Sequence, residues 1–185
     1  MNAAEREFQL FIVNQQKISA APSAIIGSIV LWILLTVVAL ALTNLSPIAA
    51  ILAGFMAMLL HWVFEITHQL GHARAAQQTG HPMLGVRLYF LLGASLYPAD
   101  EGDLPASVHI RRALGGPIIS TLVLAIATVF LLLSWSSVGD FLRMLALFAF
   151  LDNLLIFTIG AVIPFPFPNL LENDGITLRR WWGKK

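Results

Sequence analysis

The residues with the clearest chemical potential share one otherwise apolar segment, and they are His61, Glu65, His68 and His72. In a helix, which turns by about 100° per residue, these four positions fall on one stripe. His68 and His72 are spaced i, i+4, so their imidazoles project from adjacent turns and can share one metal ion. Two buried histidines held by hydrogen bonds fit the same spacing, so the pair alone leaves both interpretations open.

A zinc site built on this pair needs a third protein ligand, and the candidate carboxylates are Glu65, Asp152 and Asp174. At about 1.5 Å per residue, His68 and His72 lie about 30–36 Å along their helix, at the far edge of a membrane. Asp152 enters from that edge and reaches a depth of about 17 Å, near the membrane centre. Asp174 follows the last apolar stretch after a proline-rich break, so it returns to the edge where the histidines lie. Depth therefore favours Asp174.

The same arithmetic places His61 at a depth of about 20 Å, level with Asp152. We expect these two side chains to be neighbours or to be bridged by water, because each then lowers the cost of burying the other. His81 and His109 lie in or beside a long loop, and we expect both to be ordinary surface residues.

The elements that must position these residues are membrane helices. Of the 185 residues, 58% are hydrophobic and 11% are charged, against about 45–50% and about 25% in soluble domains. Four apolar stretches approach or exceed the length of about 18–20 residues that crosses a bilayer as a helix. They are Ala24–Leu42, Ile48–Phe64, Ala113–Leu133 and Phe141–Ile163. The second should continue as helix to about Gln78, because no helix breaker precedes Gly80.

The sequence therefore predicts an all-α membrane protein with four transmembrane helices in a single membrane domain, 1–185. Residues 1–23 are predicted to form an interfacial N-terminal segment, as a helix or a strand, and residues 24–42 an extra span before a core at 48–182. Between the second and third spans, Val86–Leu92 and Ser95–Tyr97 flank Gly93. This pattern predicts a small β-hairpin or re-entrant loop.

Orientation follows from the basic residues, because loops rich in Lys and Arg stay in the cytoplasm. With four spans, ten of the 11 Lys and Arg residues lie on one side and Arg143 lies on the other. The ten are Arg6, Lys17, Arg74, Arg87, Arg111, Arg112, Arg179, Arg180, Lys184 and Lys185. We therefore expect both termini in the cytoplasm and the metal site near the cytoplasmic side. The net charge of +1 gives no basis for nucleic-acid binding, and a chain without cysteine has no thiolate ligand.

Three motifs occur in order along the chain: His68-Gln69-Leu70-Gly71-His72-Ala73, Gly115-Gly116-Pro117 and Pro164…Asp174-Gly175. Together they resemble the site-2 protease family of intramembrane zinc metalloproteases, over residues 48–182. The resemblance implies that His68, His72 and Asp174 bind zinc. It also implies that Gly116 and Pro117 let helices approach closely near the site. The middle loop would supply a strand that pairs with an unwound substrate.

The chain departs from this family at Gln69, where the family has the glutamate that takes a proton from the zinc-bound water. A neutral amide cannot take that proton, and loss of a general base costs about 10²–10⁴-fold in rate. Glu65 lies one turn away and leans towards the helix N-terminus, so we expect it to bind an imidazole instead of replacing the base. The family's asparagine before the Pro-Asp-Gly element is also missing, where the chain reads Gly160-Ala161-Val162-Ile163-Pro164.

These features favour an intramembrane zinc metallopeptidase of site-2 protease type that acts on membrane-embedded peptides and is severely impaired by Gln69. The alternative is a natural pseudo-protease that serves as a structural or regulatory subunit of a membrane complex. A third interpretation is a span protein whose histidine binds haem or a chlorin. The expected partners are membrane lipid and either a transmembrane peptide substrate or neighbouring membrane subunits.

Overall fold

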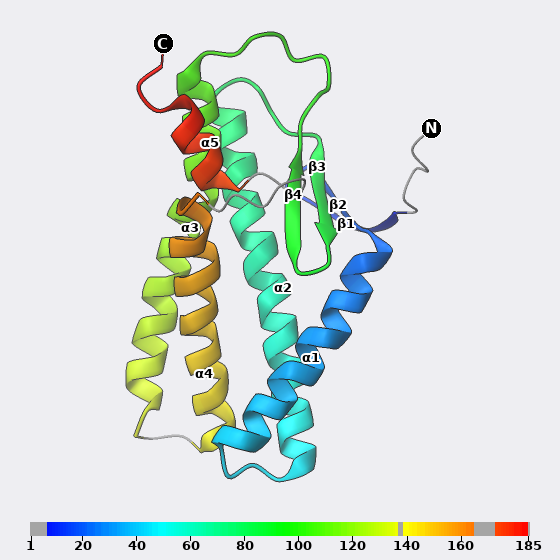
Figure 1. The fold of residues 1–185 in the computed structure, drawn as a ribbon, viewed down its shortest axis with the longest axis vertical. Helices are drawn as coiled ribbons and strands as arrows, with labels where there is room; N and C mark the ends of the chain where they lie inside the picture. Colours follow the sequence, from blue (N-terminus) through cyan, green and yellow to red (C-terminus); the bar gives the residue numbers. More distant parts are fainter. Residues whose placement is uncertain (1–6, 137–138, 165–172, 185) are drawn as a thin grey trace.

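The computed structural model describes residues 7–136, 139–164 and 173–184. Within them, four helices are long and apolar enough to cross a membrane, as predicted. They are α1 (Pro22–Leu42), α2 (Pro47–Gln78), α3 (Ala106–Ser134) and a fourth in which α4 (Asp140–Asp152) continues as a π-helix (Asn153–Gly160). A short helix, α5 (Asp174–Trp181), packs against α3 (Figure 1). The chain is an integral membrane protein.

Local sequence sets the limits of α2. Ser46 caps its first turn by accepting a hydrogen bond from the backbone N–H of Ala49, and Pro47 occupies the first helical position. The helix then runs for 32 residues, a length of about 48 Å, so it exceeds the membrane core by several turns. Gly80, with φ of +77°, follows its end. The predicted continuation to about Gln78 is therefore confirmed.

Helices α2 and α3 approach each other closely at two glycines. A Cβ atom added to Gly71 would collide with the backbone of Gly115, and one added to Gly115 would collide with the backbone of Gly71. Small residues at such a crossing allow close packing of membrane helices. This crossing brings the α3 backbone beside the polar stripe of α2.

The strands of the described part form one four-stranded sheet in the order β1-β2-β3-β4. The strands are β1 (Phe8–Val13), β2 (Gln16–Ala20), β3 (Gly85–Tyr89) and β4 (Leu92–Leu96). The pairing of β2 with β3 is parallel and the other two pairings are antiparallel. The N-terminal segment thus forms a hairpin that extends the predicted β-hairpin. Ile18, Val86 and Leu88 of the sheet share a hydrophobic core with Ala73 and Ala76 of α2.

The turn of the second hairpin differs from the prediction. Tyr89 pairs with Leu92, so Phe90 and Leu91 form the turn and Gly93 lies within β4. Phe90 has a positive φ of 27°. The glycine at position 93 is used for a close contact with α2 instead of a turn, because an added Cβ would lie 2.6 Å from Oε1 of Glu65.

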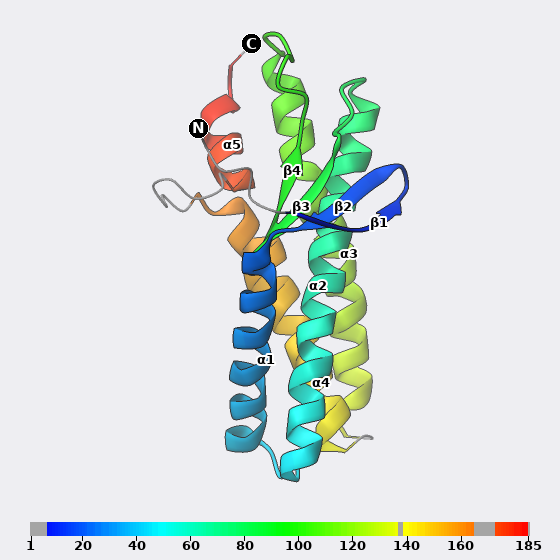
Figure 2. The ribbon, with the colours of Figure 1, turned by 90° about the vertical axis from the view of Figure 1, so that its right-hand side faces the viewer.

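The sheet lies beside α2, at the same end of the helix bundle as α5 (Figures 1 and 2). The α1–α2 connection and the start of α4 lie at the opposite end. The β3–β4 turn points back along the bundle towards α1 (Figure 1). There, Gly27 of α1 leaves room for the carbonyl of Phe90, which an added Cβ would overlap.

Candidate metal centre

Two histidines of α2 and one aspartate of α5 converge where these helices meet. Nε2 of His68 and Nε2 of His72 lie 3.0 Å apart. Oδ2 of Asp174 lies 3.3 Å from Nε2 of His68 and 3.4 Å from Nε2 of His72. The ligand atoms of the three side chains all lie within 4.8 Å of one another. The fold thus brings together residues that are 102 positions apart, counting from His72 to Asp174.

These distances suit a tetrahedral metal ion. A tetrahedron with metal–ligand bonds of about 2.0–2.1 Å has ligand–ligand edges of about 3.3–3.4 Å. The three observed separations, 3.0, 3.3 and 3.4 Å, match those edges closely. Two imidazoles and one carboxylate are a donor set that zinc accepts, with a fourth position left for water or substrate.

The far side of each imidazole is held by α3. Nδ1 of His72 lies 2.7 Å from the carbonyl oxygen of Arg112, and Nδ1 of His68 lies 2.9 Å from Oγ of Ser120. The backbone N–H of Gly116 also approaches Nδ1 of His72, at 3.3 Å. The Arg112 carbonyl is nearer and can only accept, so Nδ1 carries the proton and Nε2 presents a lone pair to the centre. Such partners orient metal-binding imidazoles.

Gly116 lies directly against the two imidazoles. A Cβ atom at this position would overlap Nε2 of both His68 and His72. The residue is buried within α3, next to Pro117, which is also buried. Glycine at this position therefore keeps the space between the ligand atoms open.

Asp174 is held in place by the residues around the start of α5. The Asn173 side chain caps the helix, accepting from the N–H of Ile176 at 3.0 Å, and its Nδ2 donates to the carbonyl of Ile163 at 2.7 Å. Burial favours a higher pKa for the Asp174 carboxyl, but the neighbouring His72 and His68 rings outweigh it and hold the pKa below its usual value. Asp174 is therefore ionised at neutral pH, as a metal ligand must be.

Gln69 and Glu65 point to the sheet, where they bond to β4. Nε2 of Gln69 donates to Oε1 of Glu65 at 2.9 Å and to the carbonyl of Gly93 at 3.0 Å. Oε1 of Gln69 accepts from Oγ of Ser95 at 2.8 Å. Glu65 also accepts from the N–H of Gly93 at 2.8 Å. The expected contact of Glu65 with an imidazole is replaced by these contacts with Gln69 and the Gly93 backbone.

The predicted neighbours His61 and Asp152 are in contact, with Nδ1 of His61 3.2 Å from both carboxylate oxygens. The other ring nitrogen lies 2.8 Å from the carbonyl of Leu91, in the β3–β4 turn.

The expectation for His109 needs a correction, because its ring stacks on Trp181 at 4.2 Å with an interplanar angle of 6°. This stacking joins α5, which carries Asp174, to α3.

Arg112 anchors the loop after β4 to α3, a role that the sequence alone does not reveal. The Arg112 guanidinium is buried and forms an ion pair with Glu101 at 2.5 Å, and it donates to the carbonyl of His81 at 2.6 Å. It also lies 4.1 Å from the centre of the Tyr97 ring. Arg112 thereby ties the loop after β4 to the helix whose carbonyl orients His72. The sequence shows an acidic loop with Asp100, Glu101 and Asp103, but nothing in it identifies Glu101 as the partner of Arg112.

Comparison with known proteins supports the fold. No family model matches the chain, and no curated protein matches its sequence. Among solved structures, the chain is similar to the site-2 protease from Methanocaldococcus jannaschii, with a TM-score of 0.60 at 19% identity. The match covers 95% of this chain and 70% of that one. The chain thus has the fold of a site-2 protease.

Proposed function

We propose that this chain is a membrane-embedded zinc protein of the site-2 protease type, with His68, His72 and Asp174 as the zinc ligands. The observation that carries this proposal is the near-tetrahedral arrangement of Nε2, Nε2 and Oδ2, at separations of 3.0 to 3.4 Å. The fold shared with a solved site-2 protease supports it. So do the α3 groups that orient the two rings.

In this proposal the zinc ion, when bound, polarises a peptide carbonyl and lowers the pKa of its water. The residues of this chain bind the ion and hold α2, α3 and α5 around it. The side chain at position 69 cannot take a proton from that water, because Gln69 carries a neutral amide. We infer that peptide hydrolysis is severely weakened, by about 10²–10⁴-fold relative to a chain with a glutamate base.

One observation favours the alternative of a natural pseudo-protease that serves as a subunit of a membrane complex. Both N–H groups and the carbonyl oxygen of Gln69 have hydrogen-bond partners in the protein. An amide that merely replaced a catalytic carboxylate would not need partners matched to its donors. The proposed partners are membrane lipid and either a transmembrane peptide or neighbouring membrane subunits. Nucleic acid is not among them.

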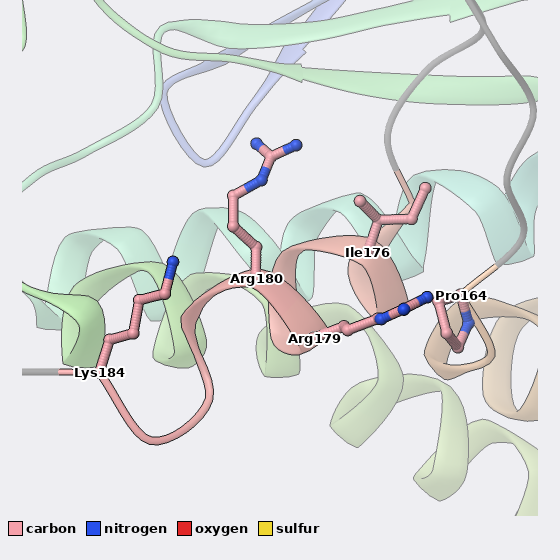
Figure 3. A pocket seen from close by; sticks show the side chains of 5 residues that line it. All are labelled: Pro164, Ile176, Arg179, Arg180 and Lys184. Carbon is pink, nitrogen blue, oxygen red and sulfur yellow. The ribbon is translucent and has the colours of Figure 1, made fainter.

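We further propose that both termini and the metal centre face the cytoplasm. Arg179, Arg180 and Lys184 of the C-terminal segment line a shallow hollow with Pro164 and Ile176 (Figure 3). Trp182 beside them is 71% exposed. Basic and aromatic side chains together suit the anionic headgroup region of the inner leaflet.

The chain has no cysteine, so single cysteines introduced in place of Asp103 and Asn44 can be labelled with an impermeant maleimide. The first should react from the cytoplasmic side and the second from the other.

Metal analysis of the purified protein tests the proposed function. We expect about one zinc per chain, lost in His72→Ala and Asp174→Ala. His81→Ala and Asp103→Asn are the matched controls, because these residues lie outside the cluster, and both should keep the zinc. A parent protein without zinc after loading would overturn the proposal. A visible absorption band of a haem or chlorin would favour the third interpretation.

A further inference from the structure

The outer edge of β4 is occupied by side chains of α2. Gly93 lies opposite Leu88 of β3, and alternate residues of an edge strand point their backbone groups away from the neighbouring strand. The Gly93 N–H donates to Oε1 of Glu65, and the Gly93 carbonyl accepts from Nε2 of Gln69. A residue of an added strand would make the same pair of hydrogen bonds, because its carbonyl would accept from the Gly93 N–H and its own N–H would donate to the Gly93 carbonyl.

The contacts of Gln69 require an amide. The Glu65 carboxylate and the Gly93 carbonyl are acceptors, so the group that lies 2.9 and 3.0 Å from them must be the NH₂. The amide oxygen is left facing Oγ of Ser95, which donates to it. A carboxylate at position 69 would supply no donor and would face the carboxylate of Glu65. Exchange of glutamine for glutamate is therefore not neutral at this position.

The contact is tight and buried. A Cβ atom at position 93 would lie 2.6 Å from Oε1 of Glu65 and 3.2 Å from Nε2 of Gln69, so only glycine allows this approach. Glu65 and Gln69 are 2% and 5% exposed. Because water has little access, each lost hydrogen bond leaves a buried polar group without compensation.

We propose that Glu65 and Gln69 together act as a strand mimic that closes the outer edge of β4 at Gly93. An extended peptide that adds to β4 at this point must first displace both side chains. If the proposed function holds, Gln69 has two effects at one position: it removes the general base and it occupies the strand edge beside the metal ligands. The edge contact itself does not depend on zinc.

Hydrogen exchange of the full chain in detergent, followed by mass spectrometry of peptides that cover 92–97, tests this contact. Gln69→Glu should raise the exchange rate of β4 by about tenfold or more, because it removes two donors and places two carboxylates together. The double variant Glu65→Gln/Gln69→Glu removes the repulsion between the two carboxylates but still leaves the Gly93 carbonyl without its donor. Its exchange rate should therefore lie between those of Gln69→Glu and the parent.

Gln77→Glu is the matched control, because it makes the same chemical change at an exposed site on α2, and it should leave β4 unchanged. If Gln69→Glu does not fold, Gln69→Met removes the donors without adding a charge and should raise β4 exchange by about threefold or more. Unchanged exchange in Gln69→Glu, or a double variant that exchanges faster than Gln69→Glu, would overturn the proposal. Zinc content measured on the same samples separates the two proposals, since loss of zinc with normal exchange counts against the metal centre alone.

Discussion

Nδ1 of His61 lies 3.2 Å from both carboxylate oxygens of Asp152, a residue 91 positions later in the chain. The other ring nitrogen of His61 faces the carbonyl of Leu91 at 2.8 Å. A carbonyl oxygen only accepts, so the Nε2 that faces Leu91 carries a proton and Nδ1 faces the Asp152 side chain. The contact links α2, the fourth span and the tip of the β3–β4 hairpin.

Removal of one member of this pair should be costly. Asp152→Ala leaves the histidine buried without its partner, and we expect a loss of about 3–5 kcal/mol in the free energy of unfolding. The loss can be measured by reversible unfolding in SDS. Asp100→Asn, at an exposed site, serves as the control and should change stability by less than about 0.5 kcal/mol. A similar loss in both variants would show that the His61–Asp152 contact contributes little.

Gly116→Ala should weaken metal binding more than it weakens the fold. The added methyl group would overlap Nε2 of both His68 and His72, so the rings must turn away from each other. We expect zinc affinity, measured by competition with a chelator, to fall by about tenfold or more, as for other changes that misorient ligands. Gly102→Ala is the control, since an added Cβ there meets nothing within 4 Å. Equal affinities in the two variants would mean that the rings do not depend on this space.

The rise of a helix is fixed, and this made part of the site predictable from the sequence. Depth along the spans placed His61 level with Asp152, and their contact is confirmed at 3.2 Å. Depth also favoured Asp174 over Asp152 as the partner of His68 and His72, and Oδ2 of Asp174 lies 3.3 and 3.4 Å from their Nε2 atoms.

Contacts that depend on how distant elements pack were not predictable. The parallel pairing of Lys17 with Gly85 joins segments with two membrane helices between them. Gly93 looked like a turn residue, since glycine is common in turns, but it serves the approach to Glu65. The partners of Glu65 could not be found by helix geometry alone, because they come from a hairpin whose position is set by the rest of the fold.

The ion pair between Arg112 and Glu101 should make stability depend on pH. The hydrogen bond from Arg112 lowers the pKa of Glu101, and burial opposes it only in part. A lowered pKa in the folded state adds stability above the unfolded pKa, and this stability is lost as the pH falls through the folded pKa. Glu101→Gln should therefore lower Tm at pH 7, and this difference should shrink as the pH falls below about 4.3, the ordinary pKa of a glutamate. Asp103→Asn, in the same loop, should show no such pH-dependent difference. A Tm difference that stays constant with pH would exclude this linkage.

Restoring a carboxylate at position 69 should restore peptide cleavage more fully when Glu65 is changed as well. In Gln69→Glu alone, the new carboxylate faces that of Glu65, which lies 2.9 Å from the present amide, so the two repel each other and disturb β4. In Glu65→Gln/Gln69→Glu, the neutral amide at position 65 no longer repels the carboxylate at position 69. We expect the double variant to cleave a membrane-anchored peptide at least about tenfold faster than the single variant, with the parent slower than both.

Zinc content is compared in the same preparations. Equal cleavage by the two variants would show that Glu65 does not oppose a base at position 69. Zinc-loaded variants that both fail to cleave a panel of such peptides would instead support a natural subunit role.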